Sequence, residues 1–236
     1  MLIQIYSLTE PDDVRRCVTL GVDRVGLAPS GQGVPAEVSW EDARGLFDLL
    51  PAGVAGSALT VATDPDAIVE MVRAVRPDVL HLCPSEGAIE LAGDRALRRR
   101  LPSEVEVMTA VAVGDATSLE ATLARAERAA EVSDTLILDS VAPGIPGIGA
   151  AGAVHDWSVS AAVVDAVGDR VPVILAGGLG PDNVAAAIAA VGPHGVDSYT
   201  RTSLDEQRKD PAALAAFVEA ARTASPRSRG GPGART

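Results

Sequence analysis

Short apolar runs alternate along this chain with longer amphipathic segments, of which residues 65–75 are a representative example. Such alternation is typical of βα units, in which parallel strands are joined by helices that cover the sheet. The pattern therefore predicts a series of eight βα units. The apolar runs that we expect to form strands are residues 2–6, 23–28, 53–61, 78–83, 104–111, 135–139, 171–177 and 195–200.

Eight βα units fit either a closed (β/α)8 barrel or an open, doubly wound sheet, and periodicity alone does not separate these two folds. The dinucleotide-binding form of the open sheet carries G-x-G-x-x-G after its first strand, but residues 6–9 here read Tyr-Ser-Leu-Thr. Single barrels commonly have about 250 residues. We therefore predict an α/β protein with one (β/α)8 TIM barrel over residues 1–224, followed by a disordered Gly-, Pro- and Arg-rich tail over residues 225–236.

Composition supports this fold and restricts the partners. Hydrophobic residues make up 47% of the chain but aromatic residues only 3%, which suits a barrel interior filled by branched aliphatic side chains. The formal charge of -12 argues against nucleic acid or an anionic membrane as a partner, because both require a basic surface. With two cysteines, no apolar run of membrane-spanning length and no leader-like start, we expect a cytoplasmic protein, either monomer or homodimer.

The C-terminal ends of barrel strands carry function, and a glycine turn stands at one of them. Gly177 and Gly178 directly follow the run 171–177. Glycines at such a place let the backbone approach a ligand, and their amides can hold a phosphate. A simple tight turn explains the same sequence equally well.

Asp139 ends another apolar run, where a carboxylate can serve as a general acid or base if burial raises its pKa. It can equally cap a loop amide or pair with an arginine. The loop that follows, residues 142–152, is rich in glycine and longer than a barrel connection needs. We expect it to act as a lid or binding loop.

His81 and Cys83 lie two residues apart on one expected strand, so their side chains face the same side of the sheet. No further cysteine or histidine stands near enough in sequence to complete a metal site, so we expect a packed histidine, a buried thiol and no metal. Lys209 is the only lysine and falls in the polar run 206–210. A Schiff-base aldolase needs a buried barrel lysine and is therefore excluded at this stage.

Taken together, these motifs resemble the phosphoribosylanthranilate isomerases of tryptophan biosynthesis in order and spacing. The resemblance covers nearly everything except the tail, and it is strongest in the last third of the chain. The segments that carry it are residues 4–9, 138–140, 143–144, 149–152, 156–157, 175–184, 195–197 and 209–210.

The resemblance implies an Amadori rearrangement, in which an acid opens the sugar ring of an aminoaldose phosphate and a base removes the C2 proton. Asp139 falls on the family's acid, and Tyr6 falls on its base, which is a cysteine. The implied ligand is a small phosphorylated sugar, without a cofactor. The implied contacts, in the glycine loop, the glycine turn and the loop after the last strand, are Gly149, Gly152, Gly177, Gly178, Thr200 and Arg201.

Several family positions have changed. A phenol near pKa 10 is a poorer base at pH 7 than a thiol, so His81 and Cys83 join Tyr6 as candidate bases. The family's arginine after the second strand, which holds the anthranilate carboxylate, is absent from residues 28–34. Arg201 replaces a glycine at the phosphate site and adds a cation that can pair with phosphate. We therefore expect an isomerase with a changed phosphosugar substrate, or alternatively a phosphosugar-binding or regulatory protein without turnover.

Overall fold

A computed structural model describes residues 1–84, 86–114, 118–140, 147–149, 152, 154–205 and 207–226. The strands are β1 (Leu2–Ile5), β2 (Arg24–Pro29), β3 (Glu37–Val38), β4 (Ala55–Thr60), β5 (Val79–Leu82), β6 (Glu106–Val113), β7 (Thr135–Ser140), β8 (Val173–Leu175) and β9 (Gly195–Ser198). The helices are α1 (Pro11–Thr19), α2 (Trp40–Phe47), α3 (Pro65–Val75), α4 (Ala88–Gly93), α5 (Arg95–Arg98), α6 (Leu119–Ala130), α7 (Trp157–Val167), α8 (Val184–Val191) and α9 (Pro211–Thr223), with a 3-10 turn η1 (Thr200–Thr202).

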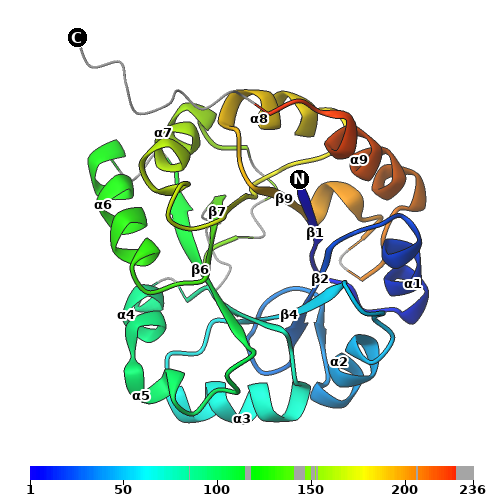
Figure 1. Cartoon of the computed structure of the whole chain (residues 1–236). Helices are drawn as coiled ribbons and strands as arrows, with labels where there is room; N and C mark the ends of the chain where they lie inside the picture. Colours follow the sequence, from blue (N-terminus) through cyan, green and yellow to red (C-terminus); the bar gives the residue numbers. More distant parts are fainter. Residues whose placement is uncertain are drawn as a thin grey trace.

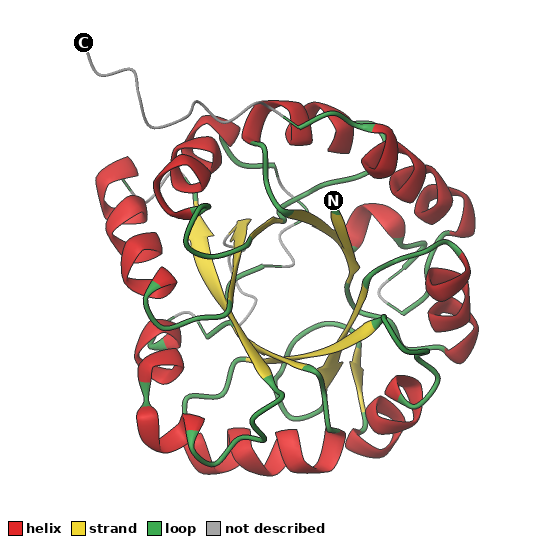
Figure 2. Ribbon diagram, viewed as in Figure 1, coloured by secondary structure: helices red, strands yellow, loops and turns green. Residues whose placement is uncertain are grey.

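The strands form a closed barrel, which confirms the predicted fold. Within the described residues the order is β1-β9-β8-β7-β6-β5-β4-β2, and β1 also pairs with β2, so the sheet has no open edge there. Every strand pairing in the ring is parallel. The helices surround the ring (Figures 1 and 2).

Local sequence explains where several helices begin. The carboxylate of Asp64 accepts a hydrogen bond from the amide of Asp66, and Pro65 occupies the first turn of α3. Asp210 likewise caps α9, and Ser118 caps α6. Each cap satisfies an amide that would otherwise lack a partner at the helix start.

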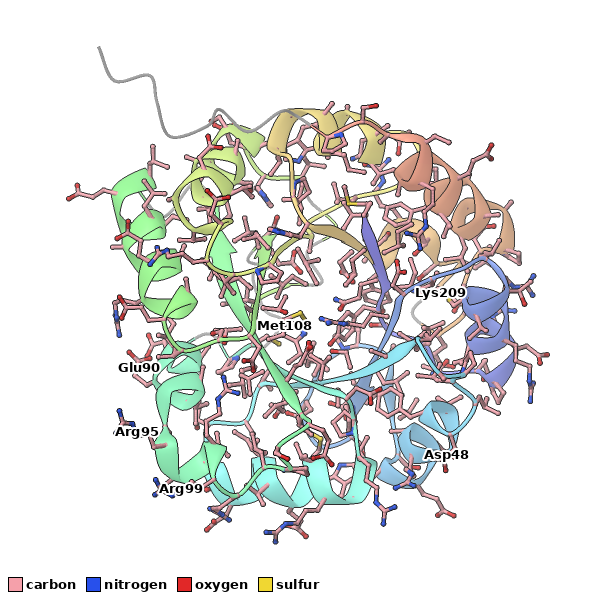
Figure 3. The ribbon with its side chains drawn as sticks, viewed as in Figure 1. Asp48, Glu90, Arg95, Arg99, Met108 and Lys209 are labelled. Atoms are coloured by element: carbon pink, nitrogen blue, oxygen red, sulfur yellow. The ribbon has the colours of Figure 1, made fainter. Side chains whose placement is uncertain are left out.

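The core has two parts, one between strands and helices and one inside the barrel. The inner cluster includes Tyr6, Met108, Ile137 and Ile174. Because side chains alternate across a strand, Asp139 faces the same side of β7 as Ile137. Met108 lies within the ring, whereas charged residues such as Arg95 stand on the outer helices (Figure 3). The inward alternation thus brings a carboxylate to the barrel mouth.

Some elements differ from the expected ones. β3 is a two-residue strand outside the ring, paired with the end of β2, and such a short element gives no periodic signal. The last expected strand ends at Ser198, because the chain turns into η1 at Thr200. Of the expected tail, residues 227–236 lie outside the described part. In that part, no helix is long and apolar enough to cross a membrane.

Candidate functional site

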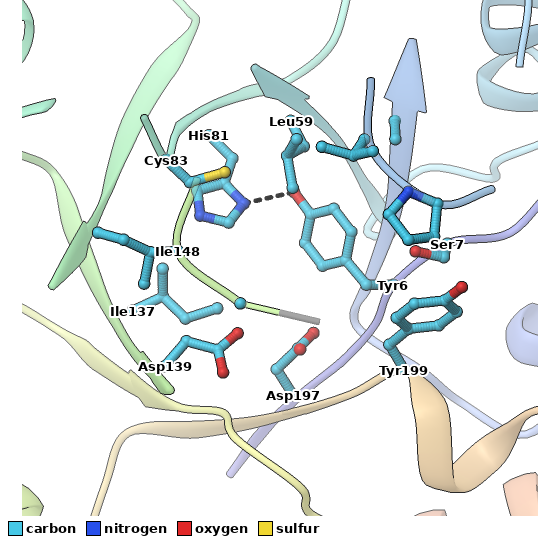
Figure 4. Close-up of a pocket in the computed structure, with 14 residues that line it drawn as sticks. Tyr6, Ser7, Leu59, His81, Cys83, Ile137, Asp139, Ile148, Asp197 and Tyr199 are labelled. Atoms are coloured by element: carbon cyan, nitrogen blue, oxygen red, sulfur yellow. Dashed lines mark hydrogen bonds between the residues drawn. The ribbon is translucent and has the colours of Figure 1, made fainter. Parts of the chain in front are cut away.

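A pocket opens at the barrel mouth, at the C-terminal ends of the strands, and its walls are mostly apolar (Figure 4). We refer to it as the apolar pocket. It brings together residues from β1, β2, β4, β5, β7 and β9 and their following loops. The lining residues are Tyr6, Ser7, Ala28, Val34, Pro35, Leu59, His81, Cys83, Ile137, Asp139, Ile148, Gly149, Asp197 and Tyr199.

A second, smaller hollow adjoins it, and we refer to it as the glycine pocket. Its lining residues are Asp139, Gly152, Gly177, Gly178, Leu179, Asp197, Ser198, Tyr199 and Thr200. The two pockets share Asp139, Asp197 and Tyr199. A ligand that fills both pockets must therefore pass these three side chains.

The shared carboxylates, Asp139 and Asp197, lie side by side with their oxygens turned into the cavity (Figure 4). Burial, and then the charge of Asp197, raises the pKa of Asp139 to about 7, although the backbone amide of Ser140 donates to Asp139 Oδ1 at 2.7 Å. Burial also raises the pKa of Asp197 to about 7, against the opposing effects of a hydrogen bond from Gln4 and the charge of Lys209. Near neutral pH, this pair can hold one proton between two acids.

Tyr6 occupies the place expected for a base, but its side chain is packed and hydrogen-bonded inside the barrel. Its hydroxyl lies 2.8 Å from Ser57 Oγ and 2.9 Å from His81 Nδ1. Its ring packs on Gly26, where a β-carbon would stand 2.6 Å from the ring atoms. Burial raises the pKa of Tyr6 well above its ordinary value. A phenol in this state is a poor proton acceptor at neutral pH.

His81 and Cys83 face the cavity together, as their spacing predicted, but neither is a strong base. Burial, and then the charge of Arg24, lowers the pKa of His81 to about 3, so the imidazole stays neutral. Burial, and then the charge of Asp139, raises the pKa of Cys83 to about 12, so its thiol stays protonated. Within the described residues, no group of three potential metal ligands forms.

The glycine turn has the geometry of a cradle. Gly177 and Gly178 both have left-handed φ values, 83° and 61°, which glycine adopts without strain. A β-carbon on Gly177 would stand 2.7 Å from Ser140 Oγ and 2.8 Å from His155 Nδ1. Asn183 fixes the turn, because its side chain accepts from the amide of Gly180 and donates to the carbonyl of Gly178.

The other expected ligand contacts divide between the two pockets. Thr200 and Gly152 meet in the glycine pocket, where a β-carbon on Gly152 would stand 3.2 Å from Thr200 Oγ1. Gly149 lines the apolar pocket instead, and a β-carbon there would stand 2.7 Å from Asp139 Oδ2. Arg201 lines neither pocket: its guanidinium makes two hydrogen bonds, of 2.8 and 2.7 Å, to Asp182.

The structure describes only part of the loop that we expected to form a lid. Residues 142–146, 150 and 151 lie outside the described part of the chain. Of the remainder, the amide of Ile148 donates to the carbonyl of Cys83, and the amide of Gly149 donates to the carbonyl of Ser140. This piece of the loop therefore rests on the mouth of the barrel.

The loop after β2 is organised without a cation. The carboxylate of Glu37 accepts hydrogen bonds from the amides of Gly31, Gln32 and Val34, and the side chain of Gln32 accepts from the amide of Val61. Among the described residues, neither lysine nor arginine lines the apolar pocket. A ligand carboxylate would find no charged partner on these walls.

Lys209 corrects one prediction from the sequence. It lies in a polar run, yet only 2% of it is exposed, and burial lowers its pKa to about 8. Its ammonium group donates to the carbonyl of Tyr199 and to Ser203 Oγ, beside the Tyr199 ring. It does not line either pocket, so the position of Lys209, rather than its exposure, speaks against a Schiff-base site.

The barrel, its glycine cradle and the inward acid on β7 can be compared with known proteins. The sequence model of the N-(5'-phosphoribosyl)anthranilate (PRA) isomerase family matches residues 3–220. The chain belongs to this family. A PRA isomerase of Haloferax volcanii is 35% identical over 224 residues, covering 94% of this chain and 93% of the relative.

Solved PRA isomerases share the fold. The Thermotoga maritima structure has a TM-score of 0.75 and 27% identity, covering 94% of this chain and 99% of that one. Another structure of a PRA isomerase contains reduced 1-(o-carboxyphenylamino)-1-deoxyribulose 5-phosphate. It has a TM-score of 0.72 and 25% identity, covering 94% of this chain and 98% of that one.

Two residues here were not among the predicted site residues: Asp197, which lines both pockets, and Gln4, which contacts it. Gln4 Nε2 donates to Asp197 Oδ1 at 3.1 Å, across 193 positions of sequence. One signal was available for Asp197, which is an acid inside the short apolar run that forms β9. Gln4 stands in a segment that carries the family resemblance, but its contact with Asp197 was not predictable, because it depends on the pairing of β1 with β9.

Proposed function

We propose that this chain is an aldose–ketose isomerase that converts a 5-phosphorylated ribosylamine into the corresponding aminoketose. The observation that carries this proposal is the pair of carboxylates at the junction of the two pockets, the half-buried Asp139 and the buried Asp197. With a phosphate in the glycine pocket and the amine substituent in the apolar pocket, the sugar itself would lie against both acids. Family membership supports the same reaction.

Asp139 is suited to the first step. Its pKa of about 7 keeps a substantial protonated fraction near neutral pH, and the negative charge of Asp197 favours that protonated form. A proton passes from Asp139 to the ring oxygen, the C1–O bond breaks, and the nitrogen lone pair forms a C1=N bond. Loss of the C2 proton then gives an enolamine, which tautomerises to the ketone. A positioned acid of this kind contributes about 10²- to 10⁴-fold in rate.

The proposed phosphate site comprises the amides of the glycine turn, Gly177 and Gly178, together with Gly152 and Thr200. Backbone amides that converge at a glycine turn bind anions without requiring a net positive surface. This suits a chain of formal charge -12. We also propose that the guanidinium of Arg201, which now bonds Asp182, turns toward the phosphate when it binds, with or without losing its bonds to Asp182.

We further propose that the amine substituent differs from anthranilate in having no carboxylate. The described walls of the apolar pocket supply two acids and no cation, so an anionic substituent would be repelled. The alternative of a binding protein without turnover is less favoured, because two adjacent acids in a mostly apolar pocket cost stability and binding alone gives no reason for their presence.

The test compares two glycosylamines made from ribose 5-phosphate, one with aniline and one with anthranilate. We expect turnover of the aniline compound to exceed that of the anthranilate compound. Val34→Arg should shift the ratio of their kcat/KM values about 10- to 100-fold toward anthranilate, because a charged hydrogen bond contributes about 1.5–3 kcal/mol. Val34 lines the apolar pocket, which makes it a direct site for the added cation.

Val34→Met is the matched control, since it lengthens the side chain without adding charge. It should leave the ratio unchanged. Efficient turnover of the anthranilate compound by the unmodified protein would contradict the proposed change of substituent. Lack of turnover with either compound would contradict the isomerase itself.

A further inference from the structure

The isomerisation needs a group that accepts the C2 proton, and the three side chains suggested by sequence are unsuited to it. The Tyr6 hydroxyl lies within hydrogen-bond distance of both Ser57 and His81. The same contact occupies Nδ1 of His81. Its Nε2 has no hydrogen-bond partner among the described residues, but burial lowers the pKa of His81 to about 3, which makes the imidazole a weak base. Cys83 is buried as a thiol. The acceptor must therefore be sought elsewhere on the cavity wall.

We propose that Asp197 is this base, so that the carboxylate on β9 performs the step for which Tyr6, directly after β1, is unsuited. The inference rests on the proposed function, because it assigns a step of that reaction. Asp197 lines both pockets, which places it where C1 and C2 of a bound sugar would lie. It shares this position with Asp139 and Tyr199 alone among the described residues.

The surroundings of Asp197 favour its charged form over that of Asp139. Gln4 Nε2 donates to Asp197 Oδ1 at 3.1 Å, and the positive charge of Lys209 acts in the same direction. Within the described part of the chain, Asp139 receives one backbone hydrogen bond, and the charge of Asp197 opposes its ionisation. When environments differ in this way, the proton of a carboxylate pair resides mainly on one member, here Asp139.

Hydrogen bonding also leaves Asp197 able to react. Gln4 contacts only Oδ1, and within the described residues no hydrogen bond to the second oxygen, Oδ2, is found. Only 6% of the residue is exposed, so bulk water does not hold this carboxylate in a hydration shell. A buried, singly anchored carboxylate with one free oxygen has the geometry of a general base.

The step is balanced without another reactant. After ring opening, Asp197 takes the proton from C2, the C2–H electron pair forms a C1=C2 bond, and the C=N electrons return to nitrogen. Loss of the C2 hydroxyl proton and addition of a proton at C1 then give the ketose. C2 is oxidised and C1 is reduced within one molecule. The protonated Asp197 is a ready source of the proton for C1.

The first experiment measures Asp197→Asn with the aniline compound of ribose 5-phosphate. Turnover should fall by about 10²- to 10⁴-fold, the contribution of a positioned base. Affinity for ribose 5-phosphate should change less than threefold, since the amide keeps the shape of the side chain. That affinity also shows that the variant is folded. An unchanged kcat would overturn the assignment.

The second experiment uses the pH profile, which a purely structural role for Asp197 would not alter. Among the described residues, the titratable and charged groups facing Asp197 are Tyr6 after β1, Asp139 from β7, Tyr199 after β9 and Lys209 before α9. Gln4→Lys puts a cation in contact with Asp197 and should move the acid limb of kcat/KM about one unit lower or more. Gln4→Met should not move it lower.

The outcomes separate the two levels of the account. If the wild-type protein turns over the compound, Asp197→Asn keeps that turnover and Gln4→Lys leaves the acid limb of kcat/KM where it was, then Asp197 is not the base. The proposed isomerase activity is unaffected by that result. Absence of turnover of both the aniline and the anthranilate compound by the wild-type protein overturns both. Loss of turnover in Asp197→Asn together with the shifted limb in Gln4→Lys supports the base.

Discussion

Asp139→Asn is expected to reduce kcat/KM by about 10²- to 10⁴-fold, because the amide cannot give a proton to the ring oxygen. The side chain keeps its size, so affinity for ribose 5-phosphate should stay within a few-fold. The measurement is turnover of the aniline compound beside titration with ribose 5-phosphate. Equal turnover in wild type and variant would remove Asp139 from the mechanism.

The same variant should be more stable than the wild type at alkaline pH. The folded-state pKa of Asp139 is raised from 3.8 to about 7, so its contribution to stability is full below about pH 3.8 and is lost as pH rises through about 7. Above that range the charge on Asp139 costs about 1–3 kcal/mol. A pKa difference of one unit corresponds to about 1.4 kcal/mol, and the total for the change from 3.8 to about 7 is discounted because water enters the pocket mouth.

The check is thermal unfolding at pH 5 and pH 8. The gap in Tm between Asp139→Asn and the wild type should widen in favour of the variant as pH rises. Asp12→Asn is the control, because its side chain is 87% exposed and should show no such trend. A gap that narrows with rising pH would contradict the assigned direction of the Asp139 pKa.

Gly177→Ala should weaken binding of phosphorylated ligands by 10-fold or more. The added methyl group would stand 2.7 Å from Ser140 Oγ and 2.8 Å from His155 Nδ1, and the φ of 83° also disfavours alanine. The turn must shift, and its amides shift with it. Isothermal titration with ribose 5-phosphate measures the loss.

Gly21→Ala separates backbone strain from damage to the site. Gly21 has a similar φ of 77°, but its methyl group would meet no atom within 4 Å, so stability should fall while affinity is kept. If both variants kept wild-type affinity, the phosphate would have to bind elsewhere. Arg201→Ala extends this test: a loss of affinity there, with none in Asp182→Ala, assigns the guanidinium to the phosphate.

The barrel was predictable because its signal is local and repeated. Each strand is a short apolar run, and each helix shows its own period. Errors in the predicted bounds of single elements therefore did not change the predicted fold. The inward position of Asp139 followed from the same alternation, since it stands two residues after Ile137. The glycine turn was recognisable because Gly177 and Gly178 directly follow a buried strand.

The base and the environment of Lys209 were not predictable in this way. Asp197 gains its properties from Gln4, a contact created only when β1 closes the barrel against β9. Lys209 is buried because the chain pairs it with Ser203 and places its ammonium group beneath Tyr199. Its sequence neighbours are polar and gave the opposite indication. Both features arise from tertiary contacts, which override local composition.

The most direct test of the isomerase is to follow the aniline compound labelled with ¹³C at C1 of the ribose by NMR in the presence of the wild-type protein. The account predicts that the anomeric carbon signal is replaced by that of a methylene carbon bonded to nitrogen, at a rate far above that without protein. Persistence of the anomeric signal in this compound and in the labelled anthranilate compound, with ribose 5-phosphate still bound by the protein, would contradict it.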